Sequence, residues 1–425
     1  MSELDDRIEA HIPALREALA GQDEVVDVLV DAATHAWLTR SLDLRVHGEQ
    51  RAQARDRLTS RFTLGGACFA GRYAGNLAGL RDEIPYLRDL GVTLLRVESP
   101  FETGADGTPD LRRIDRGLGS LQRMVELTDA LRLAGISLAL PVAASGDVVA
   151  FVRDVLFLVD HGVEAFVVDD TATAAVLAAV LAISAPGVVV LPGSPGAAPL
   201  WQSFLTGHAA PLRRAIRWRD GSSRVVAVRD AEAVDGLGCG TTASLAGVDT
   251  DDPHGEARAV LAHALALSVP GIPMLWLGDE VGQLDDPSYR DDPDRRGDER
   301  WLHRGQNPRD RYATRADATT SAGRMFSAIT KLIAVRHTTP EFDGTRLVGF
   351  DVPGDTIAAF QRPDDDTVVL VLANVGAEAA SVDATTLSGF EPAAWDLIEG
   401  VEVDMTDGVT LAPCGFRWLR VTPRG

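Results

Sequence analysis

Lysine is nearly absent from this chain, and cysteine is scarce. Lys331 is its only lysine, so arginine carries almost all of the positive charge. The three cysteines, Cys68, Cys239 and Cys414, lie far apart, which matches neither a disulfide framework nor the spacing of a metal site. We therefore expect no metal and no other cofactor, and a reducing compartment such as the cytoplasm.

Long apolar runs and an excess of positive charge are also missing. No stretch of about eighteen apolar residues predicts a membrane span, and the acidic residues 1–7 do not resemble the start of a signal peptide. The 425 residues include 62 acidic and 41 basic side chains, which gives a formal net charge of −21. Because so acidic a surface repels phosphate, nucleic acid and anionic membranes are not expected partners.

Three regions differ in the pattern of their apolar residues. Residues 1–60 repeat them at helical spacing, which predicts helices that cap the main domain rather than a partner-binding arm. Residues 61–338 alternate short apolar runs with amphipathic stretches, which indicates parallel strands covered by helices. The amphipathic stretches predict helices over residues 77–90, 121–134, 148–161, 172–183 and 256–268. Residues 339–425 contain short strands separated by Gly, Pro and Asp turns, which predict a small antiparallel β-sandwich.

The middle region has the repeat expected of a barrel. Its clear strand-like runs begin near residues 66, 92, 136, 165, 188, 224 and 272. This number favours an α/β fold with a (β/α)8 barrel of the TIM type over an open sheet. The remaining strand, the sixth, should lie between residues 196 and 219, where residues 200–206 predict only a weak strand.

Several segments resemble a known family. Residues 271–284 read GIPMLWLGDEVGQL and residues 289–304 read YRDDPDRRGDERWLHR, which is similar to the eighth-strand region of amylosucrases. These enzymes are the sucrose-using branch of the α-amylase superfamily, glycoside hydrolase family thirteen. Residues 65–87 resemble the family's first strand and helix, and residues 332–344 resemble its bridge into the C-terminal domain. The resemblance spans most of residues 60–425 and implies a barrel followed by an antiparallel domain.

The chemistry of this family needs carboxylates. A retaining enzyme uses one as a nucleophile and a second, protonated one as acid and then base. By resemblance, Asp169 stands at the nucleophile position, but Val167 replaces the arginine that would orient it. Gly193 stands where the acid/base glutamate is expected, and Asp230 matches the third, sugar-gripping acid, with Arg229 in place of the family's histidine.

Other parts of the family's site are reduced. The Asn-His pair that follows strand three aligns with Ser145 and Gly146. The subdomain normally inserted there is absent, because residues 144–147 lead directly into the next predicted helix, and the segment after strand seven, residues 231–252, is short. A shallow site admits water and loses the preorganised electrostatics that the chemistry requires.

Each candidate residue has a structural alternative. For Asp169 we favour a retained strand-end polar residue over a nucleophile, and for Asp230 sugar binding and a salt bridge stay open. Arg300 matches an arginine that reaches the sugar in amylosucrases, and an ion pair within its charged loop is an equal alternative. Asp279 and Glu280 end the last strand, where we prefer support of the loop to substrate binding.

Glu98 is new relative to the family. It ends the second strand, where the family is usually apolar, so it could supply a proton in an altered reaction. The favoured alternative is an ion pair with Arg96 or Arg229.

These observations together predict a degenerate relative of amylosucrase. We expect it to be catalytically inactive or strongly impaired, and to act in carbohydrate metabolism as a partner or regulator of an active paralogue, as a self-associating protein, or as a weak binder of sucrose or α-glucan. One alternative is an active retaining α-glucosyltransferase or hydrolase that uses Asp169 on sucrose or α-glucan. Another is a different enzyme on a reused barrel.

Overall fold

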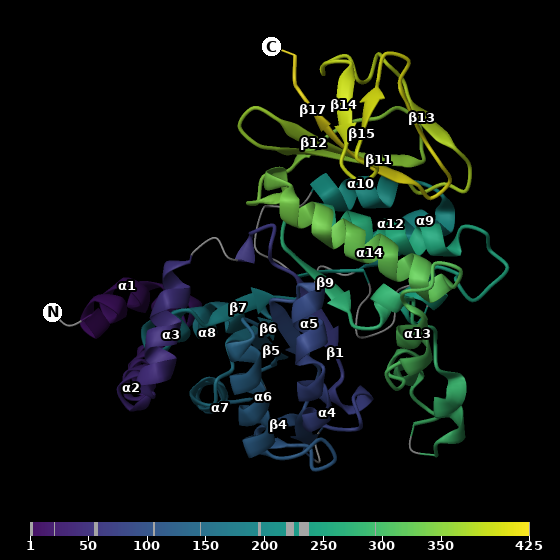
Figure 1. The fold of residues 1–425 in the computed structure, drawn as a ribbon. Coiled ribbons are helices and arrows are strands. Elements are labelled where there is room, and N and C mark those ends of the chain that lie inside the picture. The colour runs from purple at the N-terminus through teal and green to yellow at the C-terminus, as the bar shows by residue number, and fades with distance from the viewer. Residues whose placement is uncertain are drawn as a thin grey trace. The chain divides into compact units, whose positions relative to one another are not determined.

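The computed structural model describes residues 3–20, 22–54, 58–104, 107–144, 146–193, 197–217, 225–228, 238–293 and 295–424 (Figure 1). The chain divides into two compact units. Unit one comprises Met1–Arg57 and Leu64–Gly193, and unit two comprises Leu58–Thr63 and Ser194–Gly425. None of the described helices is long and apolar enough to span a membrane.

Unit one contains a parallel sheet with the strand order β7-β6-β5-β2-β1. Its strands are β1 (Gly65–Cys68), β2 (Leu94–Val97), β5 (Ser137–Pro141), β6 (Ala165–Val168) and β7 (Val189–Pro192). Every residue of β1 and β6 is buried, as expected for a parallel strand that is covered on both faces. The register brings the last residue of β6, Val168, opposite Pro192 of β7, so the carboxyl ends of these two strands lie side by side.

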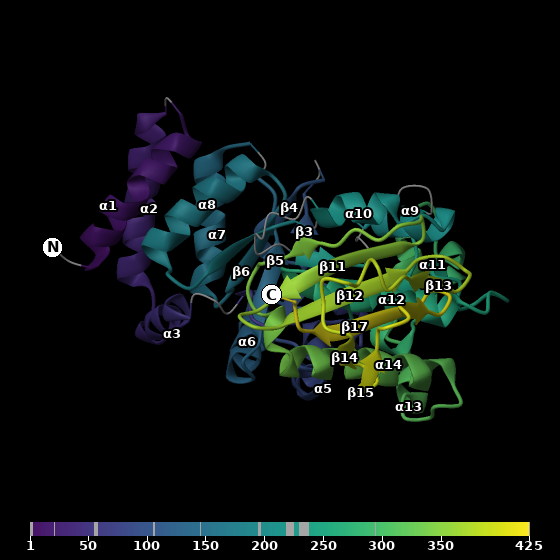
Figure 2. The ribbon, with the colours of Figure 1, turned by 90° about the horizontal axis from the view of Figure 1, so that it is seen from above.

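The helices of unit one lie between and outside these strands. They are α1 (Glu3–Ala18), α2 (Asp23–Thr39), α3 (Leu42–Gln53), α4 (Leu77–Asp82), α5 (Ile84–Leu90), α6 (Leu121–Leu133), α7 (Val148–Asp160) and α8 (Thr171–Ser184). Helices α1 and α2 pack on α8, where both views show them side by side (Figures 1 and 2). The N-terminal helices therefore form a cap on the helical layer, through buried residues such as Leu15 and Leu29.

Two details of unit one bear on the sequence predictions. The stretch 77–90, predicted as one helix, is divided into α4 and α5 at Glu83, because Pro85 belongs in the first turn of a new helix. A hairpin of β3 (Phe101–Thr103) and β4 (Pro109–Ile114), which the sequence did not predict, follows β2. As predicted, β5 is followed directly by α7, with Asp147 as its N-cap, so no subdomain is inserted there.

Unit two supplies two further parallel strands, β8 (Val225–Ala227) and β9 (Ile272–Trp276), which pair with each other. Its helices in this part are α9 (Ala198–Thr206), α10 (Ala210–Arg217), α11 (Thr242–Leu245), α12 (Gly255–Ser268), α13 (Arg309–Thr314) and α14 (Ser321–Thr338). The 3-10 helices η3 (Asp279–Val281), η4 (Pro287–Asp291) and η5 (Glu299–His303) follow β9. Parallel strands with intervening helices confirm the predicted α/β class.

The prediction of a weak sixth strand is wrong for residues 197–217, which form α9 and α10. Pro199 occupies the first turn of α9, and Gly207 ends it with a left-handed φ of 68°. Trp201 and Phe204 lie three positions apart and are both buried, with their rings 5.6 Å apart. The indole N–H of Trp201 donates to the Val228 carbonyl at 2.7 Å. Buried side chains three positions apart lie on one face of a helix, whereas a strand would bury every second residue.

The C-terminal part of unit two is antiparallel, as predicted. One sheet has the strand order β10-β11-β12-β17-β14-β15, and a second contains β13 and β16. Their bounds are β10 (Val348–Gly349), β11 (Ile357–Pro363), β12 (Val368–Asn374), β13 (Ala380–Val382), β14 (Ala393–Asp396), β15 (Val401–Asp404), β16 (Val409–Leu411) and β17 (Phe416–Val421). Seen from above, β11, β12 and β17 run side by side (Figure 2).

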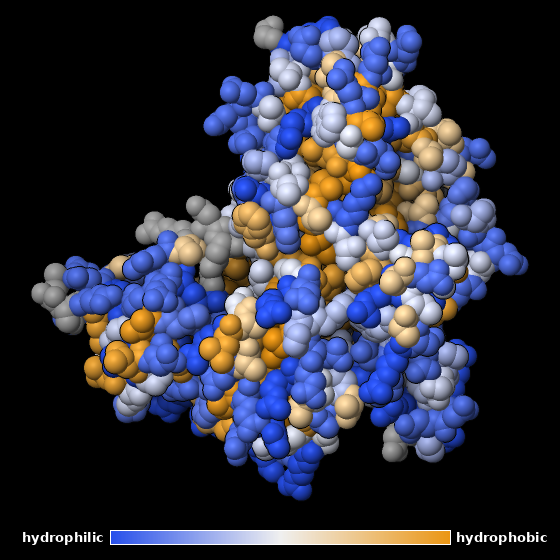
Figure 3. All heavy atoms as spheres, in the orientation of Figure 1, coloured by the Kyte–Doolittle hydropathy of each residue, from blue (hydrophilic) through white to orange (hydrophobic). Residues whose placement is uncertain are grey.

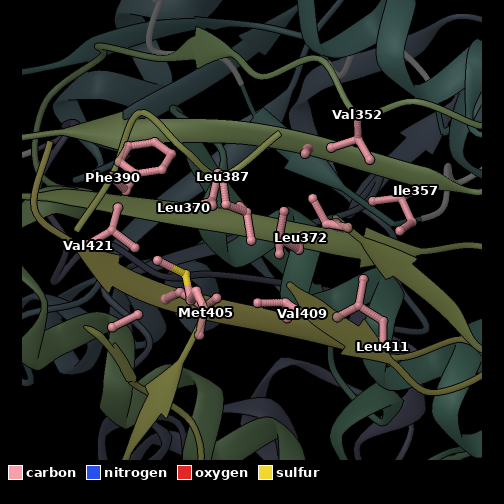
Figure 4. Packing of buried hydrophobic residues seen from close by; sticks show 14 of the residues in the cluster. Val352, Ile357, Leu370, Leu372, Leu387, Phe390, Met405, Val409, Leu411 and Val421 are labelled. Atoms are coloured by element: carbon pink, nitrogen blue, oxygen red, sulfur yellow. The ribbon is translucent and has the colours of Figure 1, made fainter. Parts of the chain in front are cut away.

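An apolar core joins the two antiparallel sheets. Leu370 and Leu372 of β12 point toward Val409 and Leu411 of β16, together with Met405 (Figure 4). Alternate residues of each strand supply this core, which is the period expected of sheets with one buried inner face. The predicted boundaries between domains, near residues 60 and 338, stay predictions.

Candidate functional site

The carboxyl end of β6 carries Asp169 and Asp170. Asp169 is exposed to solvent, although the strand residues before it are buried. The carboxylate of Asp170 accepts a hydrogen bond from the Thr173 backbone N–H at 2.7 Å and caps the N-terminus of α8. Hydrogen bonds from Thr173 lower the pKa of Asp170, so this group is ionised at neutral pH. A general acid needs a raised pKa, whereas the pKa of Asp170 is lowered. Asp170 is therefore a structural residue.

Gly193, at the end of β7, lies directly against Asp169. Its backbone N–H donates to the Val168 carbonyl at 3.3 Å, which holds the two strand ends together. A Cβ built on Gly193 would stand 1.8 Å from Oδ1 of Asp169. Asp169 therefore occupies the space into which any side chain at position 193 would extend. The resemblance implies a carboxylate at each of these two positions, and only that of Asp169 is present.

By resemblance, the residue at position 167 would be an arginine that orients the nucleophile. Here it is an apolar valine. Val167 is buried with 3% of its surface exposed, inside β6. Within the described part of the chain, Asp169 forms no ion pair with an arginine. A preorganised nucleophile is held in one orientation by its neighbours, and none of the described arginines does this for Asp169.

Glu98 lies at the carboxyl end of β2 and is buried, with 8% of its surface exposed. Its carboxylate forms an ion pair with Arg96, and its backbone N–H donates to the Cys68 carbonyl at 2.9 Å. The Arg96 alternative is thus confirmed, and the pair offsets the cost of burying each charge. Burial raises the pKa of the neighbouring Cys68 thiol to about 12, so this thiol is not a nucleophile at neutral pH.

Asp279 and Glu280 follow β9 and are almost completely buried, at 1% and 0% exposure. Asp279 accepts a hydrogen bond from the Thr242 hydroxyl at 2.6 Å. Glu280 accepts one from the Tyr312 hydroxyl at 2.7 Å and one from the Gly278 backbone N–H at 2.8 Å. These contacts join the loop after β9 to α11 and α13, which supports a structural role for both carboxylates.

Arg300 lies in the loop after β9. Its guanidinium donates two hydrogen bonds to Asp298, at 2.8 and 2.9 Å, and these lower the pKa of Asp298. The structure therefore shows the predicted ion pair within the charged loop. The remaining candidate, Asp230, and its neighbour Arg229 lie outside the described residues.

One polar group near Asp279 was missed by the sequence reasoning. His263 lies in α12, is 3% exposed, and has its Nε2 3.8 Å from Oδ2 of Asp279. The sequence predictions placed candidate site residues at strand ends, whereas His263 projects from a helix. A single histidine in the run of Ala and Leu from 261 to 267 was the available signal. Within the described residues, no three His, Cys, Asp or Glu side chains are grouped as metal ligands.

Comparisons with known proteins bear on the fold. No family model matches the chain. A 175-residue segment, 40% of this chain, is 26% identical to the glucosylglycerate phosphorylase of Escherichia coli K12, and the match spans 30% of that protein's length. Among solved structures, AmyP with maltotriose matches with a TM-score of 0.66 and 12% identity, over 86% of this chain and 99% of that chain.

Other solved structures match equally well. The trehalulose synthase MutB from Pseudomonas mesoacidophila matches with a TM-score of 0.62 and 14% identity, over 85% of this chain and 99% of that one. The α-amylase of Geobacillus thermoleovorans, solved with acarbose, also has a TM-score of 0.62, with 12% identity over 86% of this chain and 99% of the enzyme. The resemblance seen in the sequence thus agrees with the structure, and this chain has the fold of the α-amylase family, glycoside hydrolase family thirteen.

Proposed function

We propose that this chain is an α-amylase-fold protein of carbohydrate metabolism that has lost glucosyl-transfer catalysis and acts as a weak sugar binder or as a partner of an active paralogue. The observation that carries the proposal is the contact between Gly193 and Asp169. A retaining mechanism needs two carboxyl groups about 5–5.5 Å apart. Position 193 has no side chain, and the space beside it contains Asp169.

The surroundings of Asp169 support the same conclusion. The nearest acidic neighbour in sequence, Asp170, is ionised and caps a helix. Glu98 is held in an ion pair with Arg96, so this carboxylate is already in contact with a cation on its own strand. General acid catalysis contributes about 10²–10⁴ in rate, so its loss together with the orienting arginine leaves little activity.

The test is turnover of sugars by the purified chain beside an Asp169→Asn variant. Sucrose and maltotriose are followed by release of reducing sugar, and glucosylglycerate is added with phosphate because a relative is a phosphorylase of that compound. We expect no turnover, or equal traces in both proteins. Turnover that disappears in Asp169→Asn would contradict the proposal and identify Asp169 as a working nucleophile.

A binding measurement separates the two non-catalytic roles. Calorimetric titration with maltotriose should give saturable binding in the millimolar range if the chain is a sugar binder, which corresponds to about −4 kcal/mol. Absence of binding at about 10 mM would favour the partner role, which co-purification with an α-amylase-family paralogue then tests.

The second candidate function is an active retaining α-glucosyltransferase or hydrolase. The position of Asp169 at the end of β6, exposed to solvent, favours it, because a substrate could reach this carboxylate. Such an enzyme would need an acid from another part of the chain, and Asp230 is one of the remaining candidates.

A further inference from the structure

Unit two contains a cavity of about 710 Å³ between α12, α14 and the segment that joins β16 to β17, far along the chain from Asp169 and Gly193. Much of its wall is apolar, with contributions from Val260, Leu332, Leu411 and Phe416. Apolar side chains also gather on the surface between α14 and the C-terminal strands (Figure 3). A cavity of this volume with mainly apolar walls and a few polar groups is typical of a small-molecule site.

Four of the charged side chains in the cavity wall form two ion pairs. Glu256 of α12 accepts two hydrogen bonds from Arg324 of α14, at 2.9 and 2.6 Å. Asp396 accepts one from Arg417 at 2.7 Å. In each pair the two charges neutralise each other, and the pairs link different elements of the cavity wall.

Lys331 and Glu399 are the two charged lining residues outside those pairs. Both are exposed, and neither forms an ion pair with another residue in the described part of the chain. Lys331 is also the only lysine in the sequence. An ammonium group with three donors beside apolar walls complements a carboxylate attached to an apolar body. Glu399 repels a second negative charge, which disfavours phosphates and dicarboxylates.

We propose that this cavity binds an apolar monocarboxylate, with the carboxylate on the Lys331 ammonium and the apolar body against Val260, Leu332 and Phe416. The proposal does not depend on the proposed function, because none of these residues takes part in the Asp169 region. Sugars are disfavoured as ligands, since Phe416 is the single aromatic ring among the described lining residues and sugars bind largely through stacking and dense hydrogen bonding.

The unique lysine makes a direct test available. Reductive methylation with ¹³C-formaldehyde keeps the charge and labels only Lys331 and the terminal amine, so the NMR spectrum contains one side-chain signal. The probe is 3-phenylpropionate, and the uncharged 3-phenylpropan-1-ol is its matched control. We expect the carboxylate to shift the Lys331 signal saturably. A signal that 3-phenylpropionate does not shift saturably would overturn the proposal.

Calorimetry on the unlabelled protein measures the contribution of each part of the cavity. The carboxylate should bind at least about tenfold more tightly than the alcohol, and Lys331→Gln should remove this difference while leaving alcohol binding unchanged. Ala328→Phe, which fills the cavity from α14, should weaken both ligands, whereas Arg309→Gln on the exposed α13 should weaken neither. Equal affinities of the two ligands in the wild type, or full binding by Ala328→Phe, would also overturn the proposal.

Discussion

Position 193, at the end of β7, has no side chain, and this leaves room for Asp169. With glycine, the Asp169 carboxylate fills the adjoining space, and any Cβ there would be 1.8 Å from its Oδ1. The colliding atom is the free end of an exposed side chain, so Asp169 can rotate away at a modest cost. A side chain at position 193 would thus force Asp169 into another orientation, with a modest loss of stability.

A double-mutant cycle measures this coupling. We expect Gly193→Ala to cost about 1 kcal/mol in the free energy of unfolding, the cost of moving Asp169 off its rotamer. In the Asp169→Ala background the same change should be neutral, or stabilising by up to about 1 kcal/mol, because the φ of Gly193 suits alanine. Equal effects in both backgrounds, measured by urea unfolding, would show that the two positions do not interact.

At the scale of elements, two buried arginines hold the end of α12. Arg336 donates to the Leu267 carbonyl, and Arg362 donates to the Ser268 carbonyl at 3.0 Å and to the Phe342 and Asp343 carbonyls at 3.1 Å. Burial lowers the pKa of Arg336 to about 10 and that of Arg362 to about 9. The carbonyls and the negative end of the helix dipole offset this cost.

Removal of one of these guanidinium groups should be strongly destabilising. We expect Arg362→Met to lower the free energy of unfolding by about 3–5 kcal/mol, because several buried carbonyls lose their donor. Arg346→Met is the control, since Arg346 is exposed nearby and should cost less than about 0.5 kcal/mol. Similar losses for the two variants in thermal and urea unfolding would contradict the role assigned to Arg362.

At the scale of the whole molecule, His337 should make stability depend on pH. Burial, followed by the positive charges of Arg336 and Arg61, lowers the pKa of His337 below its usual value of 6.5. The unfolded chain then binds more protons than the folded chain just below pH 6.5. The contribution of His337 is therefore fully present above pH 6.5 and is lost as the pH falls through the folded pKa.

The measurement is the midpoint of urea unfolding between pH 5 and pH 8, for the wild type and for His337→Phe. Phenylalanine preserves the ring contact with Phe62, whose centroid lies 5.7 Å from that of His337. We expect the midpoint of urea unfolding to fall less steeply between about pH 6.5 and pH 5 in His337→Phe than in the wild type. An exposed histidine, His208, changed to Phe is the control, and a decline of the same steepness in all three proteins would rule out His337 as its source.

The sequence by itself determined the class of fold and most of its elements. Short apolar runs separated by amphipathic stretches are strands and helices in any compact arrangement, and the helices near 121–134, 148–161 and 256–268 form as the periodicity predicted. By resemblance, the sequence also places Gly193 and Val167 at positions where the family has glutamate and arginine, because the family's motifs are local.

Only the tertiary structure decided what the remaining side chains do. Residues 200–206 have an apolar pattern that suits a short strand or a helix, and the burial of Trp201 and Phe204 selected the helix. The ion pair of Glu98 with Arg96 and the helix cap at Asp170 are local contacts, whereas the occupation of the space beside Gly193 depends on which strand ends are neighbours. Gly193 and Asp169 lie on different strands, so no local pattern specifies their contact, whereas packing does.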